Sequence, residues 1–214
     1  MFQNKKRGKV LAAVFLFIIL LFFLLGAGAG LARCEDPLCA KITVPSFDRG
    51  FAQKFLRFSI GASLVGCERW IFDLRNCTGG QDSEALRTAW MFLPEDATVV
   101  FESIKNKSGF SAVNADSFQF EEEDIDFQID GQVIILVSRQ TSGAGELFAA
   151  SLQDNHRAVI IGEKTAGDKS LMKYFSPLTR RCLLGGIEPD IKADVSNGKE
   201  IFELARSFLA GTKI

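Results

Sequence analysis

The stretch Gln132–Gln153, QVIILVSRQTSGAGELFAASLQ, decides the fold because a buried strand, a glycine turn and a helix follow one another in it. Gln132–Ser138 is a continuous apolar run, as is typical of a buried strand. The turn Thr141–Glu146 then leads into a helix expected from about Ala144 to Gln153. A strand–turn–helix unit of this kind is the repeating unit of α/β folds with a mainly parallel sheet.

The rest of the chain continues the alternation of strands and helices. Strands are expected at Trp70–Leu74, Ala97–Glu102 and Arg157–Gly162, and helices at Ser46–Leu64, Asp82–Leu93 and Lys199–Ala210. Four phenylalanines at helical spacing within the first helix predict a core-facing stripe rather than a ligand surface. Asn197 with Glu200 predicts a capping box at the start of the last helix.

The chain has 214 residues and a formal net charge of −1, which indicate the number of domains and argue against nucleic-acid binding. The length gives room for one ordinary domain after an N-terminal segment. The near-neutral charge gives no field that would attract nucleic acid. The acidic run Glu121–Asp124 lacks the spaced ligands of a calcium loop, and a single histidine without a CxxC pair argues against zinc. We expect no metal and no cofactor.

Residues 10–32 form an apolar segment without charge or proline, long enough to cross a bilayer as a helix. The basic stub 1–9 before it predicts a cytoplasmic N-terminus and an extracytoplasmic domain, in the periplasm or at the cell surface. The alternative is a signal peptide cleaved near Ala27–Ala29, which would release a secreted protein. We expect a linker over 33–45 and the folded domain over 46–214.

The five cysteines, Cys34, Cys39, Cys67, Cys77 and Cys182, suit an extracytoplasmic domain. Cys34 and Cys39 could close a small disulfide loop at its base. Cys67 and Cys77 are expected to fill buried space.

Two glycine turns carry the candidate chemistry. Gly79-Gly80 and Ser142-Gly143-Ala144 each lie between an expected strand and an expected helix. On adjacent strands, their backbone N–H groups would converge as in an oxyanion hole. The alternative is that the glycines only allow close packing.

Three segments resemble the C-terminal processing peptidases, or tail-specific proteases, which are serine enzymes with a lysine base. They are DLRN with Gly79-Gly80 at 73–80, the helix and strand over 146–163, and KYFSP through GIEPD at 173–190. The resemblance implies an α/β fold of the ClpP/crotonase type. It also implies an oxyanion hole formed by the amides of Gly79, Gly80 and Ala144.

The positions that carry catalysis in this family differ here. The resemblance places the nucleophilic serine at Gly143, the lysine base at Asp168 and the glutamine that orients it at Met172. None of these residues can perform the family role. The family's PDZ module and a β-hairpin before Lys173 are also expected to be missing.

The sequence therefore predicts a membrane-anchored pseudoprotease that binds a polypeptide or a partner protease. The alternative is an active serine peptidase that uses Ser142 with Lys169 as a displaced nucleophile and base. A product of degeneration without a selected role also stays open. The single histidine, His156, is expected to be a solvated or capping residue.

Overall fold

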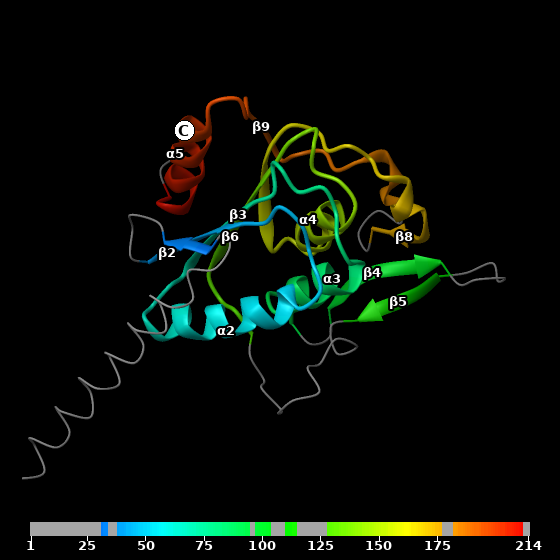
Figure 1. The fold of residues 1–214 in the computed structure, drawn as a ribbon, viewed down its shortest axis with the longest axis horizontal. Helices are drawn as coiled ribbons and strands as arrows, with labels where there is room; N and C mark the ends of the chain where they lie inside the picture. The colour runs from blue at the N-terminus through cyan, green and yellow to red at the C-terminus, as the bar shows by residue number, and fades with distance from the viewer. Residues whose placement is uncertain are drawn as a thin grey trace, which may run out of the picture.

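The computed structural model describes residues 31–33, 38–94, 97–103, 110–114, 128–176 and 182–211. These residues form an α/β fold with two sheets, a six-stranded one and a three-stranded one (Figure 1). The expectation of a mainly parallel sheet flanked by helices is confirmed.

The six-stranded sheet has the order β1-β2-β3-β6-β7-β9. Its strands are β1 (Leu31–Arg33), β2 (Cys39–Thr43), β3 (Arg69–Asp73), β6 (Gln132–Val137), β7 (Ala158–Gly162) and β9 (Ile191–Lys192). Only the pair β1–β2 is antiparallel. Asp73 pairs with Leu136, and Val137 pairs with Gly162, so the carboxyl ends of β3, β6 and β7 lie at one edge.

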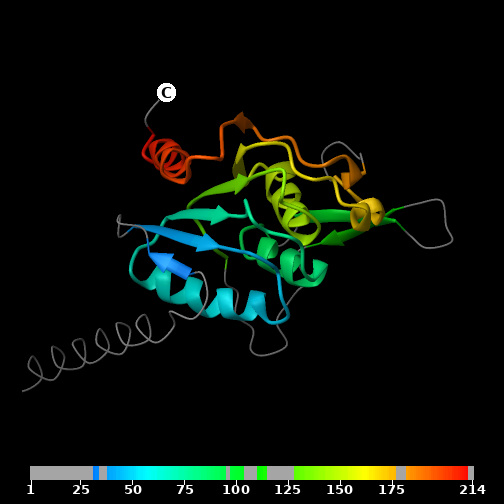
Figure 2. The same ribbon diagram turned by 45° about the horizontal axis from the view of Figure 1, so that its top comes forward.

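Helices cover both faces of this sheet (Figures 1 and 2). Helices α2 (Phe51–Leu64), α3 (Asp82–Trp90) and α4 (Ala144–Asp154) share one core with alternate residues of the strands, such as Phe72 and Ile135. Helix α5 (Gly198–Leu209) packs against the other set, which includes Ile71 and Leu136. Successive residues of a strand point to opposite faces of the sheet. Phe72 and Ile135 therefore face α2, α3 and α4, whereas Ile71 and Leu136 face α5.

Aromatic rings fill the larger core. Phe55 lies within ring-contact distance of Trp70, Phe72 and Phe92, at 5.9, 5.4 and 5.8 Å between centroids. Phe148 of α4 contacts Phe72 at 4.9 Å. The core-facing stripe is confirmed for Phe51, Phe55 and Phe58. The expected helix start at Ser46 is wrong, because α2 begins at Phe51 and Phe47 reaches the same core from a bridge with Gly80.

The smaller sheet contains β4 (Thr98–Ser103), β5 (Phe110–Asn114) and β8 (Tyr174–Phe175) in the order β5-β4-β8. A 3-10 turn, η2 (Lys169–Lys173), leads directly into β8, and a second, η3 (Leu183–Gly185), follows later. The chain thus passes from the loop after β7 to β8 through one short turn.

The expected linker over 33–45 is wrong in part, because Cys39–Thr43 is strand β2 inside the sheet. The expected apolar segment 10–32 also runs two residues into β1. Its remaining residues, 10–30, lie outside the described part of the chain, as do Cys34 and Glu121–Asp124. Among the described residues, the helices are too short or too polar to traverse a lipid bilayer.

The start of α5 follows the prediction closely. Asn197 accepts hydrogen bonds from the N–H groups of Lys199 and Glu200, at 3.2 and 3.5 Å. The Glu200 carboxylate accepts from the Asn197 side-chain amide at 3.1 Å. The expected N-cap is confirmed, with the return bond made between side chains.

Candidate active site

Three loops meet at the carboxyl edge of the large sheet, and hydrogen bonds join them. The Thr141 hydroxyl donates to the Leu74 carbonyl at 2.8 Å. The Ser142 N–H donates to the Cys77 carbonyl at 3.0 Å, and the Ala166 N–H donates to the Thr141 carbonyl at 3.0 Å. The two glycine turns therefore follow neighbouring strands, and the loop after β7 lies against the second turn.

The turn over residues 142–145 is a type II′ β-turn. Gly143 has φ 55° and ψ −122°, and the Gly145 N–H donates to the Ser142 carbonyl at 3.1 Å. These angles belong to the first central position of a type II′ turn, which strongly favours glycine. The sharp turn that would present a nucleophile is present, and a residue without a side chain occupies its tip.

Cys77 fills the space beside this turn. A Cβ at Gly145 would lie 2.9 Å from the Cys77 Sγ, so a larger residue there would collide with the thiol. Burial raises the pKa of the Cys77 thiol. Cys67 is buried as well, so both cysteines fill internal space as expected.

The first glycine turn is held against Phe47. The Phe47 N–H donates to the Gly79 carbonyl at 2.9 Å. Gly80 has φ 120°, and a Cβ there would lie 2.5 Å from the Phe47 nitrogen. Only glycine satisfies both the backbone angle and the close approach.

Three backbone N–H groups at this edge, those of Gly79, Gly80 and Ala144, donate to no acceptor within the described part of the chain. We call these three groups the cradle. A Cβ at Gly79 would lie 4.0 Å from the Ser142 carbonyl oxygen, which places the first turn in contact with the second. Ala144 is the first residue of α4, where the helix dipole favours negative charge. These three donors, unpaired within the described residues, are the ones that the family resemblance assigns to the oxyanion hole.

Glu146 joins the type II′ turn over residues 142–145 to the loop after β7. This role was not predicted from the sequence. Its side chain is fully buried. Its Oε2 accepts from the N–H groups of Gly143 at 3.1 Å and Asp168 at 3.0 Å. Its Oε1 accepts from the Gly167 N–H at 2.7 Å and from the Thr165 hydroxyl at 2.5 Å. Both oxygens of this buried carboxyl group are therefore fully hydrogen-bonded, and they join the turn at Gly143 to the loop over residues 165–168.

Gly143 and Asp168, which the resemblance places at the nucleophile and the base, lie close together. Their backbone N–H groups donate to the same oxygen, Oε2 of Glu146. Met172 lies in η2, beyond this loop. Lys169 begins η2 and is exposed, and Ser142 is partly exposed. Within the described residues no hydrogen bond joins Ser142 to Lys169.

The DLRN segment fastens the site to the rest of the domain. The Arg75 guanidinium donates to both carboxylate oxygens of Asp73 at 2.8 Å, and this pairing raises the pKa of Arg75. It also donates to the Val195 carbonyl at 3.3 Å. Arg75 is thus committed to internal contacts rather than to a ligand.

His156 lies at the far end of α4 from Gly143. It is exposed, follows the C-cap residue Asn155 and has φ 55°, the left-handed conformation common after a helix end. This placement agrees with the expected solvated or capping role. Across the described ranges, no cluster of three His, Cys, Asp or Glu side chains is arranged to hold a metal ion.

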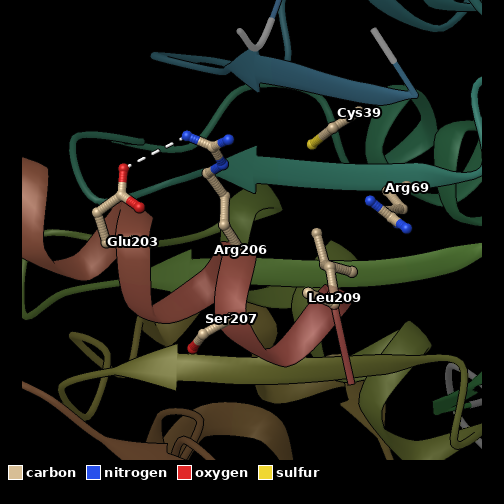
Figure 3. Close-up of a pocket in the computed structure, with 7 residues that line it drawn as sticks. Cys39, Arg69, Glu203, Arg206, Ser207 and Leu209 are labelled. Carbon is tan, nitrogen blue, oxygen red and sulfur yellow. Dashed lines mark hydrogen bonds and ion pairs between the residues drawn. The ribbon is translucent and has the colours of Figure 1, made fainter. Parts of the chain in front are cut away.

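Two cavities lie near the large sheet, at opposite edges. One of about 1070 Å³ opens beside the site and is lined by Thr165, Ala166, Arg139 and Lys192, among others. The other, of about 240 Å³, lies beside α5 at the first residues of β2 and β3, where Arg206 pairs with Glu203 at 3.4 Å (Figure 3).

Comparison with known proteins supports the resemblance. The sequence profile of peptidase family S41 matches residues 39–184. Carboxyl-terminal-processing peptidase 1, chloroplastic, of Arabidopsis thaliana is 28% identical over 143 residues, covering 59% of this chain and 28% of that protein. The tail-specific protease of Haemophilus influenzae is 27% identical over 128 residues, covering 60% of this chain and 17% of that protein.

Solved structures show the same fold at low sequence identity. The photosystem II D1 C-terminal processing protease superposes with a TM-score of 0.61 at 21% identity, covering 87% of this chain and 50% of that one. A lipoprotein from Streptococcus agalactiae gives a TM-score of 0.66 at 16% identity, covering 85% of this chain and 69% of that one. The chain spans a third or less of the length of the curated relatives it matches.

Proposed function

The chain belongs to peptidase family S41, and from that premise we propose that it is a membrane-anchored tail-specific protease homologue that binds polypeptide without cleaving it. One observation carries this proposal. The type II′ turn that should present the nucleophile keeps its shape, and Gly143 stands at its tip.

Loss of catalysis follows from the chemistry of the site. Glycine has no hydroxyl to attack a peptide carbonyl, and the carboxylate of Asp168 replaces the lysine base. In serine proteases, removal of the nucleophile lowers turnover by roughly a millionfold. The oxyanion donors that stay behind retain only a small part of the acceleration.

Binding is supported by what the site keeps. The three cradle N–H groups lack acceptors in the described part of the chain. A cavity of about 1070 Å³ opens at the loop after β7, where Thr165 and Ala166 line it. An extended polypeptide could place a carbonyl or a terminal carboxylate on the cradle. A partner protease of the same family would offer the same chemistry through an extended segment.

Membrane anchoring is supported by the apolar segment 10–32 and the basic stub 1–9. The domain would then be extracytoplasmic, with secretion after cleavage near residues 27–29 as the alternative. Flotation of the expressed full chain with membranes after alkaline washing tests the anchor. Release of a shortened chain into the soluble fraction would contradict it.

Binding is tested with fluorescein-labelled unfolded casein by anisotropy, using the full chain and an Ala144→Pro variant. Ala144 is the first helical residue, where proline is well tolerated, so the variant removes one cradle N–H and keeps the helix. We expect the parent chain to bind intact casein and the variant to bind about three- to tenfold more weakly, the effect of one hydrogen bond. Equal binding by the two proteins would show that the cradle does not hold the polypeptide.

A further inference from the structure

An apolar patch is exposed at the amino edge of the large sheet. Leu64 is 65% exposed, Leu38 40% and Val65 38%, and they are three of the five large hydrophobic side chains most exposed in the described part of the chain. A Cβ at Gly66 would lie 3.8 Å from the Leu38 Cδ2, so Leu38 lies against the end of α2. The three side chains therefore form one surface.

A basic stripe on α2 runs into this surface. Lys54 and Arg57 are exposed, and Leu64 lies seven residues after Arg57 on the same helical face. Neither cation forms an ion pair with the described residues, and the sequence of α2 contains no acidic residue. Cations beside exposed aliphatic side chains are typical of a helix that lies on an anionic membrane surface. We call Leu38, Lys54, Arg57, Leu64 and Val65 the α2 patch.

The described chain begins at Leu31 of β1, beside the carboxyl end of β2 and so at the opposite end of that strand from Leu38. Leu31 of β1 pairs with Ile42, and Leu38 lies four residues before Ile42, about 13 Å along the strand at 3.3 Å per residue. The apolar segment 10–32 ends at β1. Figures 1 and 2 both show α2 running beneath the side of the sheet that contains β2. A membrane anchor would hold the patch near the bilayer at high local concentration.

We propose that the α2 patch docks on the anionic surface of the membrane that anchors the chain. This inference rests on the membrane anchoring proposed above. Leu38, Leu64 and Val65 lie at the amino edge of the sheet, whereas the cradle lies at the carboxyl edge. None of the three cradle residues belongs to the α2 patch, so docking would leave the cradle N–H groups outside the surface that contacts lipid.

The test uses tryptophan quenching in the full chain. Leu64→Trp and Val159→Trp variants are reconstituted in vesicles of equal parts phosphatidylglycerol and brominated phosphatidylcholine. Val159 is the matched control, because it is 37% exposed on β7, away from α2. After subtraction of the signal from the two native tryptophans, we expect strong quenching at position 64 and little at position 159.

Charge reversal tests whether Lys54 and Arg57 hold position 64 against the anionic lipid, or whether the anchor alone brings it near the bilayer. Lys54→Glu with Arg57→Glu should restore the emission of the tryptophan at position 64, as should about 1 M NaCl, where charges are screened within about 3 Å. Equal quenching at positions 64 and 159 in chains that float with the vesicles would overturn the docking proposal and leave the anchor standing. Failure of the full chain to float would overturn both.

Discussion

Gly143 adopts a backbone conformation that residues with a Cβ rarely accept. A serine at this position must hold φ near 55°, and that strain is typical of sites where a fold stores energy for chemistry. Glycine at the same position relieves the strain. The change that removes the nucleophile should therefore also stabilise the domain, which follows the general opposition between activity and stability.

Gly143→Ser is expected to lower the free energy of unfolding by about 1–3 kcal/mol, the range for one residue held in a strained region. Urea denaturation followed by circular dichroism measures the change. Gly185→Ser is the control, because Gly185 is not left-handed and a Cβ there meets no atom within 4 Å. An equal effect of the two substitutions would refute the strain argument.

Glu146→Gln is expected to lower the free energy of unfolding by about 2–5 kcal/mol, because the new amide group would face N–H donors and leave them unpaired in a buried site. Glu84 is the matched control. It is also buried but accepts one backbone bond, from Ala52 at 2.9 Å, which a glutamine oxygen can keep. Similar decreases in the free energy of unfolding for the two variants would show that the four hydrogen bonds of Glu146 stabilise the domain no more than the single bond of Glu84.

At the scale of elements, the helices and longer strands could be predicted to within a few residues. The apolar run at β6 and the aromatic spacing along α2 are long enough to predict a strand and a helix from the local sequence alone. Strands β2, β5, β8 and β9 could not be predicted. Strands β8 and β9 have only two residues each. Strands β2 and β5 are as long as β3 and β7, but a polar residue, Lys41 or Ser111, interrupts their apolar residues, so they show no continuous apolar run.

The end of α4 carries a local conflict. Asp154 is the last residue of the helix, where the dipole disfavours a negative charge. Its Oδ2 is buried and has no hydrogen-bond partner among the described residues. Burial raises the pKa of Asp154, opposed in part by a hydrogen bond with Ser176 and by His156.

Asp154→Asn is therefore expected to stabilise the domain at neutral pH. A carboxyl group whose pKa is higher in the folded than in the unfolded state favours folding when protonated, so the parent loses stability as pH rises from about 3.8 through the folded pKa. Thermal unfolding from acid to neutral pH should show the variant gaining over the parent as pH rises. A constant difference across this range would contradict the assignment.

At the scale of the whole molecule, the sequence was sufficient to locate the site but not to show what holds it together. The resemblance to the tail-specific proteases implied that the Gly79-Gly80 turn and the 142–144 turn would share one oxyanion hole, and the strands before them, β3 and β6, are indeed neighbours. Nothing in the local sequence signals that the loop 165–168 returns to Glu146, because that contact depends on the parallel pairing of β6 and β7. A glutamate three residues after the helix N-cap was the available hint.

The chain combines the fold of peptidase family S41 over residues 39–184 with a glycine at the position that the resemblance assigns to the nucleophile. The profile of peptidase family S41 covers residues 39–184, and the three loops of the site are joined as one hydrogen-bonded unit. The proposed function follows if the N–H groups of Gly79, Gly80 and Ala144, unpaired among the described residues, serve as oxyanion donors while Gly143 supplies no nucleophile. The displaced pair Ser142 and Lys169 is the alternative that experiment must address.

The most direct measurement is cleavage of unfolded casein by the full chain, followed by mass spectrometry over a long incubation, with a Ser142→Ala variant in parallel. We expect both proteins to leave the casein intact while remaining folded by circular dichroism. Fragments produced by the parent and absent with Ser142→Ala would make Ser142 a working nucleophile and contradict the account.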